Sequence, residues 1–196
     1  MLSLFTGLRP LAAPPKAGKG TKEISRGHQI LESKSGLVSI IGGKWTTYRK
    51  MAEDVVSYAS KGRLVGRKES ETRSMKIHAY QANVDYNDPL YWYGADREKI
   101  LDLVKEDPGN GEHISKSLSI IKAQVIWAVH KEMARSVEDF LSRRCRAIQL
   151  DAKESIRIAP AVAKIMAGEL AYDSQWEKDQ IAAFTSLART YLLTNS

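Results

Sequence analysis

The 196-residue sequence has a single cysteine, Cys145, so no disulfide can form within the chain. A lone thiol without a disulfide framework is typical of proteins from a reducing, intracellular compartment. No apolar run approaches the roughly 20 residues that span a bilayer, and the first 13 residues lack the basic start and cleavage site of a secretory signal. These absences predict a cytoplasmic protein, and they leave open peripheral contact with the inner face of the cytoplasmic membrane.

The usual phosphate-binding and metal-binding motifs are also absent. No G-x-G-x-x-G fingerprint occurs, and neither Lys19 nor Lys44, the two lysines that follow a glycine, has the flanking residues of a G-x-x-x-x-G-K-[ST] loop. The histidines have no cysteine partners at zinc spacing, so no metal site is expected. Cys145 lies among arginines, which fits either a thiol of lowered pKa or a helix end capped by arginines.

Positive charge is concentrated in the first third of the chain. Residues 1–76 contain 15 Lys/Arg against 6 Asp/Glu, a net charge of +9, whereas residues 77–196 contain 15 against 17, a net charge of −2. A basic segment suits an anionic partner, which could be a phosphate ligand, nucleic acid or an acidic membrane surface. A solvated basic surface without a partner is the alternative.

The first 60 residues predict part of a larger sheet. Residues 28–32 and 37–41 have the composition of two short strands, and the turn-forming residues 33–36 join them. Two strands alone are marginal in water, so further strands are expected outside this sequence. Residues 11–23 are rich in Ala, Pro, Gly and Lys and predict an exposed loop, and residues 61–78 are charged and predict a linker.

The remainder predicts a helical domain. Apolar residues recur at steps of three or four in four runs, which cover residues 96–105, 117–146, 151–170 and 173–193. We therefore expect a domain of four or more helices over residues 79–196 that folds by itself. Its tryptophans and tyrosines are expected to pack in the core or at an interface.

One motif suggests chemistry: a strand, a glycine turn and a helix start in succession. Two glycines let the backbone turn sharply, and a helix start directs unpaired N–H groups and positive dipole at a ligand. Lys44 adds a mobile cation, and Thr46 or Thr47 is suited to cap the helix. The motif predicts either an anion cradle or an ordinary turn with a solvent-facing lysine. Its residues are Gly42, Gly43, Lys44, Trp45, Thr46 and Thr47.

Motifs over nearly the whole chain occur in the same order as in one enzyme family. They are Gly7–Leu11, Gly36–Val38, Gly42–Asp54, Tyr93-Gly94, Trp127–Val129, Glu132–Arg135, Val137–Asp139, Arg143-Arg144, Leu150–Ala152, Ala159-Pro160, Val162-Ala163, Ile165-Met166 and Glu169-Leu170. The chain resembles the C-terminal portion of FAD-dependent glycerol-3-phosphate dehydrogenases. The resemblance implies a mainly α chain, with residues 1–60 as the C-terminal remnant of the FAD- and substrate-binding domain, residues 61–78 as linker, and residues 79–196 as an all-helical domain.

The resemblance also implies a reaction and roles for particular residues. The parent enzyme would oxidise sn-glycerol 3-phosphate to dihydroxyacetone phosphate by hydride transfer to FAD, and electrons would pass to a membrane quinone, or to oxygen. Arg9 would bind the substrate phosphate, and Lys44 would be both a substrate-binding and a catalytic residue. Arg49 could serve the site or form a structural ion pair. The cofactor-binding residues would be Gly42, Gly43, Lys44, Trp45, Thr46 and Thr47.

The chain departs from the family in one respect, because nothing in it corresponds to the glycine-rich ADP-binding unit. FAD is therefore expected in the parent enzyme and not on this fragment, which should be inactive without the missing N-terminal FAD domain. No nucleic-acid partner is implied. The alternative is an independent helical interaction module whose basic tail binds a membrane or nucleic acid.

Overall fold

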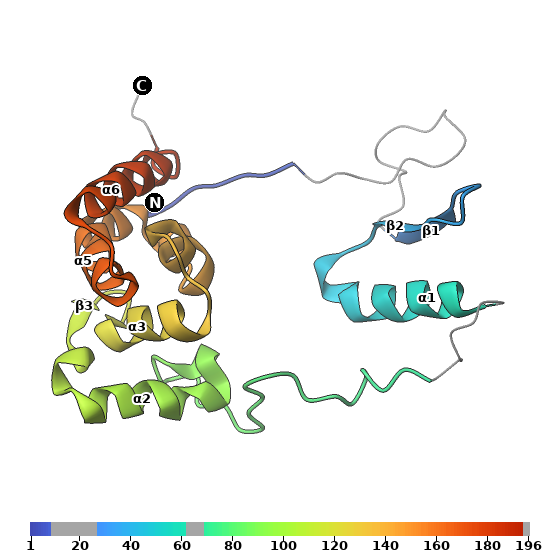
Figure 1. The fold of residues 1–196 in the computed structure, drawn as a ribbon, viewed down its shortest axis with the longest axis horizontal. Helices are drawn as coiled ribbons and strands as arrows, with labels where there is room; N and C mark the ends of the chain where they lie inside the picture. The colour runs from blue at the N-terminus through green and yellow to red at the C-terminus, as the bar shows by residue number, and fades with distance from the viewer. Residues whose placement is uncertain (9–26, 62–68, 194–196) are drawn as a thin grey trace. The chain divides into compact units, whose positions relative to one another are not determined.

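The computed structural model describes residues 1–8, 27–61 and 69–193 (Figure 1). Contacts within the chain divide it into two compact units. The strand–helix unit is Gly7–Ile77, and the helical unit is His78–Ser196 together with Met1–Thr6. The domain limits drawn from the sequence stay a prediction, and the structure adds that Met1–Thr6 pack with the later residues.

The strand–helix unit consists of a hairpin followed by one helix. Strands β1 (His28–Glu32) and β2 (Val38–Gly42) pair antiparallel, with His28 opposite Gly42. The short 3₁₀ turn Trp45–Thr47 then leads into α1 (Tyr48–Ser60). No side chain in the described part of this unit is buried. That these strands belong to a larger sheet stays a prediction.

The helical unit contains the remaining elements, and it makes the chain mainly α, as predicted. A short hairpin, which the sequence did not predict, interrupts its helices. In chain order the elements are the 3₁₀ turn Tyr91–Asp96, α2 (Arg97–Glu106), the 3₁₀ turn Pro108–Gly111, β3 (His113–Ser115), β4 (Ile120–Ile121), α3 (Lys122–Lys131), the π-helical turn Asp139–Arg144, α4 (Ala147–Leu150), α5 (Ala152–Leu170) and α6 (Ser174–Arg189).

The core of the helical unit lies where α3 and α6 pack against α5 (Figure 1). The π-helical turn contributes Phe140 and Leu141, both without any exposed surface. A smaller cluster around Ile100 and Trp127 joins α2 to α3. The largest fully buried side chains of the main cluster are Phe140, Phe184, Ile120, Leu141, Ile148, Ile158 and Met166.

The two longest helices begin where aspartates can cap them. Asp151 accepts a hydrogen bond from the Glu154 amide at 3.0 Å, and Asp173 accepts one from the Trp176 amide at 2.9 Å. A side-chain acceptor at this position satisfies one of the N–H groups that a helix start leaves unpaired. Both helices match the runs predicted from residues 151 and 173.

The single helical run predicted over residues 117–146 is wrong. Helix α3 ends at Lys131, where Met133 adopts a left-handed φ of 58°. The Ala134 amide then donates to the Ala128 carbonyl at 2.9 Å, which closes the helix end in the way a C-terminal glycine usually does. Neither glycine nor proline marks this break, so its position was not visible in the apolar periodicity.

Hydrogen bonds from the main chain and from the Ser3 side chain hold residues Met1–Thr6 to the helical unit. The Leu4 amide donates to the Tyr191 carbonyl at 2.8 Å. The Ser3 hydroxyl donates to the Ile148 carbonyl and accepts from the Ala152 amide, each at 2.8 Å. The segment therefore connects the junction of α4 and α5 with the end of α6.

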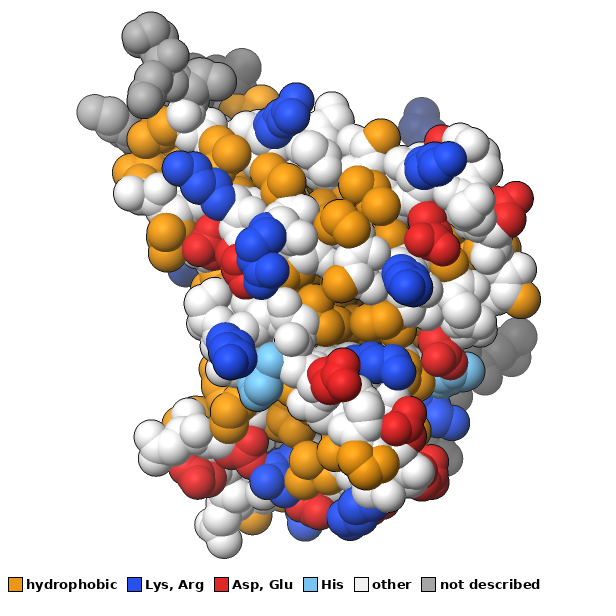
Figure 2. Space-filling view, turned by 90° about the vertical axis from the view of Figure 1, so that its left-hand side faces the viewer, with side chains coloured by type: hydrophobic (Ala, Val, Ile, Leu, Met, Phe, Trp, Pro, Cys, Tyr) orange, Lys and Arg blue, Asp and Glu red, His pale blue; other side chains and the backbone are white. Residues whose placement is uncertain are grey.

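The surface of the helical unit carries both signs of charge. Figure 2 shows Lys and Arg side chains interspersed with Asp and Glu side chains on one face, with hydrophobic side chains between them. In the described ranges, no helix is long and apolar enough to cross a membrane.

The ion pair at the start of α5 gives the fold a pH dependence. Two hydrogen bonds of 2.6 Å from Arg157, together with one from Ser115, lower the pKa of Glu154 to about 2. A carboxyl with a lowered folded-state pKa stabilises the fold above its unfolded pKa of about 4.3, and that stability is lost as pH falls toward 2. We expect Glu154→Gln to lose about 1–3 kcal/mol of unfolding free energy at pH 7 and almost none at pH 2. Denaturant unfolding at both pH values measures this, and an equal loss at the two would contradict it.

Candidate functional site

The glycine turn after β2 has a specific backbone requirement. Gly42 and Gly43 have φ values of 76° and 83°, a region that side chains other than glycine rarely adopt. A Cβ on Gly43 would lie 2.5 Å from the Met51 sulfur. The Gly43 amide donates to the Gly27 carbonyl at 3.2 Å. The second glycine is therefore explained by the turn itself and by packing against α1.

Lys44 lies at the helix start with its backbone fixed by Thr47. The Thr47 hydroxyl accepts from the Lys44 amide at 3.3 Å and donates to the Lys44 carbonyl at 3.0 Å, while the Thr47 amide donates to that carbonyl at 3.0 Å. Lys44 itself is extended and exposed. Its ammonium group has no hydrogen-bond or ion-pair partner among the described residues. The turn therefore presents a free cation beside the first N–H groups of a helix start.

The rest of the turn is open to solvent. Trp45 is 84% exposed, and its ring lies 6.0 Å from that of Tyr48. Thr46 is exposed as well. The exposed indole leaves an apolar surface beside the lysine that a planar ligand could cover.

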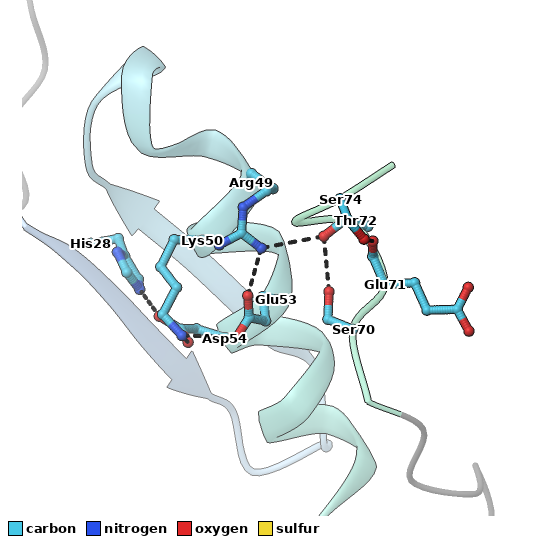
Figure 3. A network of polar contacts seen from close by, with 9 residues as sticks. All are labelled: His28, Arg49, Lys50, Glu53, Asp54, Ser70, Glu71, Thr72 and Ser74. Atoms are coloured by element: carbon cyan, nitrogen blue, oxygen red, sulfur yellow. Dashed lines mark hydrogen bonds and ion pairs between the residues drawn. The ribbon is translucent and has the colours of Figure 1, made fainter. Parts of the chain in front are cut away.

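Arg49, in the first turn of α1, is engaged in an ion pair (Figure 3). Its Nη1 lies 2.7 Å from Glu53 Oε2 and 3.3 Å from the Thr72 hydroxyl, which also bonds to Ser70 at 2.8 Å. The hydrogen bonds from Arg49 and then from Lys50 lower the pKa of Glu53. Of the two roles left open by the sequence, the ion-pair role is the one these contacts support.

A second set of contacts ties α1 to β1 (Figure 3). Lys50 Nζ lies 2.9 Å from Asp54 Oδ1 and 3.0 Å from Glu53 Oε1. His28 Nε2, on β1, lies 3.1 Å from Asp54 Oδ2. The hydrogen bond from Lys50 lowers the pKa of Asp54 most, and the bond from His28 lowers it further. His28 and Asp54 are 26 positions apart, so the sequence carries no local signal of their pairing.

The structure describes only some of the residues that the sequence predicts for the site. Residues 42–47 form one continuous turn, whereas Arg9 lies outside the described residues. The roles assigned to all of them stay predictions. Within the described ranges no group of three or more His, Cys, Asp or Glu could hold a metal. Burial raises the pKa of the Cys145 thiol to about 12, so the hypothesis of a reactive thiol is wrong.

The sequence is similar to that of known enzymes. A family model described as the C-terminal domain of alpha-glycerophosphate oxidase matches residues 37–177, more than half of the chain. A mitochondrial glycerol-3-phosphate dehydrogenase of Arabidopsis thaliana is 29% identical over 97% of this chain and 35% of its own length. The mitochondrial enzyme of Bos taurus is 30% identical over 92% of this chain and 27% of its own length. This chain therefore spans about a third of the length of these relatives.

A solved structure shares the fold. It is the glycerol-3-phosphate dehydrogenase from Bacillus halodurans complexed with FAD, which is 23% identical with a TM-score of 0.67. The match covers 86% of this chain and 39% of that one. Because the two sequences are only 23% identical, the similarity to this solved structure shows a shared fold and no more. The family is shown by the family model that matches residues 37–177. The chain belongs to the family of the C-terminal domain of alpha-glycerophosphate oxidase.

Proposed function

We propose that this chain is the C-terminal part of an FAD-dependent glycerol-3-phosphate dehydrogenase and that the turn 42–47 lines its active site. The observation that carries the proposal is Lys44, a cation without a partner among the described residues, held at a helix start within the segment that matches the family. The relatives named above are glycerol-3-phosphate dehydrogenases, and the solved structure is complexed with FAD.

The turn suits an anionic cofactor and substrate. When bound, FAD would accept the hydride from C2 of sn-glycerol 3-phosphate, and loss of the C2 hydroxyl proton to solvent would leave dihydroxyacetone phosphate. Thr47 fixes the Lys44 backbone, so the lysine and the N–H groups of the 3₁₀ turn can stabilise negative charge at the same place. Exposed Trp45 could cover an apolar face of the cofactor. We further propose that the electrons pass to a membrane quinone, which would require peripheral contact with a membrane.

The chain alone should neither hold FAD tightly nor oxidise glycerol 3-phosphate, because it contains no glycine-rich fingerprint for the pyrophosphate. Titration of FAD into the purified chain, followed by flavin fluorescence, should show no saturable binding at micromolar concentration. The intact enzyme, with the N-terminal domain present, should bind FAD and reduce it on addition of glycerol 3-phosphate. A yellow, flavin-loaded chain of 196 residues would contradict the first statement. An intact enzyme that binds no flavin would favour the helical interaction module.

Arg9 tests the substrate assignment separately. A guanidinium that binds phosphate bidentately contributes about 1.5–3 kcal/mol to binding. In the intact enzyme we therefore expect Arg9→Ala to raise KM for glycerol 3-phosphate by roughly 10- to 150-fold with flavin retained. Arg73→Ala is the matched control. Arg73 is an exposed arginine that lies 64 residues after Arg9 in the sequence, so its removal should leave KM unchanged. A KM within about twofold of wild type for Arg9→Ala would show that Arg9 does not anchor the phosphate.

A further inference from the structure

The helical unit has a cavity of about 620 Å³ that is partly open to solvent, and the glycine turn contributes no residue to it. Most of its walls come from three stretches of the unit: the 3₁₀ turn Tyr91–Asp96, the tip of the β3–β4 hairpin at residues 117–120, and residues 143–147. His78, Ala79, Pro89, Glu132 and Leu150 line the rest. Pockets that bind small ligands typically measure about 300–1,000 Å³. Nothing in the proposed reaction uses this cavity.

The charges that line the cavity leave an excess of positive charge. Arg144 donates to the Glu132 carbonyl through Nε at 2.9 Å and through Nη2 at 2.5 Å, and because a carbonyl is neutral the guanidinium keeps its charge. Arg146 has no side-chain partner among the described residues. On the acidic side, Asp96 is already paired with Lys99 at 2.8 Å and lies 2.5 Å from His78 Nε2, so Glu132 is the one other carboxylate among the lining residues. Arg144, which is held in place, and Arg146, which has no partner among the described residues, are guanidinium groups that can bind a phosphate.

Arg146 also has an unusual backbone. Its φ is 55°, in the left-handed region, immediately before α4. A residue with a Cβ is uncommon in this region, and strained residues concentrate at functional sites. The third arginine, Arg143, differs because it pairs with Glu138 at 2.5 Å and with Asp139 at 3.1 Å. Arg144 and Arg146 are therefore the two cations available to a ligand.

Glu132 also lines the cavity, but its carboxylate Oε2 is not open to it. Glu132 Oε2 has almost no accessible surface and no hydrogen-bond partner among the described residues. Burial raises the pKa of Glu132, although the charge of Arg144 opposes the rise. A ligand in the cavity would therefore meet the arginines and the aromatic side chains, and not this buried oxygen.

Aromatic side chains form the remaining wall. Tyr91 and Trp92 keep 40% and 43% of their surface exposed, and their rings lie 5.3 Å apart at an edge-to-face angle of 82°. Tyr93, which follows them, is buried. Partly exposed indole and phenol faces offer stacking surface for a planar ring, and such stacking favours the binding of nucleic-acid bases.

We propose that this cavity binds a mononucleotide, with the phosphate on Arg144 and Arg146 and the base against Tyr91 and Trp92. Only a ligand with both an anion and a planar ring uses both walls at once. Inorganic phosphate uses the arginines alone, and a nucleoside uses the aromatic wall alone.

Isothermal titration of the full chain with AMP at low ionic strength tests the proposal. AMP should bind saturably, and inorganic phosphate and adenosine should each bind at least about tenfold more weakly. Arg146→Gln should weaken AMP binding by at least about tenfold, because it removes a charged hydrogen bond. Arg189→Gln is the matched control, since Arg189 is exposed at the end of α6, outside the cavity, and it should leave the AMP affinity unchanged.

Two further variants separate this site from the glycine turn. Trp92→Leu should weaken AMP more than inorganic phosphate, because phosphate does not reach the stacking surface. Lys44→Ala should leave AMP binding unchanged, since Lys44 does not line the cavity. The proposal is overturned if AMP fails to bind at millimolar concentration, if Arg146→Gln and Arg189→Gln lose affinity equally, or if Lys44→Ala abolishes binding. Far-UV circular dichroism confirms that each variant is folded.

Discussion

Replacement of Phe140 by alanine is expected to lower the free energy of unfolding of the helical unit by about 3–5 kcal/mol. Phe140 has no exposed surface and lies in the π-helical turn, in the main core cluster that also contains residues of α3, α5 and α6. Removing the ring loses its transfer free energy and leaves a cavity that neighbours from several elements cannot readily fill. Denaturant unfolding followed by far-UV circular dichroism measures the loss.

Phe5→Ala is the matched control for this prediction. Phe5 belongs to the same unit but is 65% exposed, and its main aromatic contact is Tyr191, at 6.0 Å between ring centroids. An exposed aromatic pair contributes about 1 kcal/mol. If the two variants lose equal stability, Phe140 is not part of a packed core as the structure describes it.

Most of the helical unit could be predicted from the sequence because its long helices are amphipathic and aspartates cap them. The runs from residues 151 and 173 became α5 and α6, with Asp151 and Asp173 as caps. The stretch 117–146 could not be predicted, because Met133 and Arg146 adopt left-handed φ values that neither residue type favours. Tertiary packing outweighed local preference at those two positions.

The candidate site was predictable in position but not in its contacts. The paired glycines and the following threonines fixed a strand–turn–helix at residues 42–47. The pairing of Arg49 with Glu53 follows from their spacing of four residues on a helix. The contacts of Asp54 with His28 and of Arg49 with Thr72 join segments distant in sequence, so they needed the folded chain.

Lys44→Ala in the intact enzyme is expected to lower kcat by roughly 100- to 1,000-fold, which is typical of removing one preorganised donor to developing charge. Thr47 fixes the lysine backbone at the helix start, and no described residue neutralises its ammonium group. Charge that grows during hydride transfer is stabilised more in the transition state than in the ground state. KM should therefore change by only a few-fold.

Lys34→Ala provides the matched control, because Lys34 is an exposed lysine in the turn between β1 and β2. Steady-state kinetics of both variants, with bound flavin measured from its absorption spectrum, is the most direct test that the turn acts on the chemistry. We expect Lys44→Ala to keep its flavin and lose kcat, and Lys34→Ala to match the wild type. A Lys44→Ala enzyme with kcat within about twofold of wild type, or one that loses its flavin altogether, would show that the turn does not act on hydride transfer.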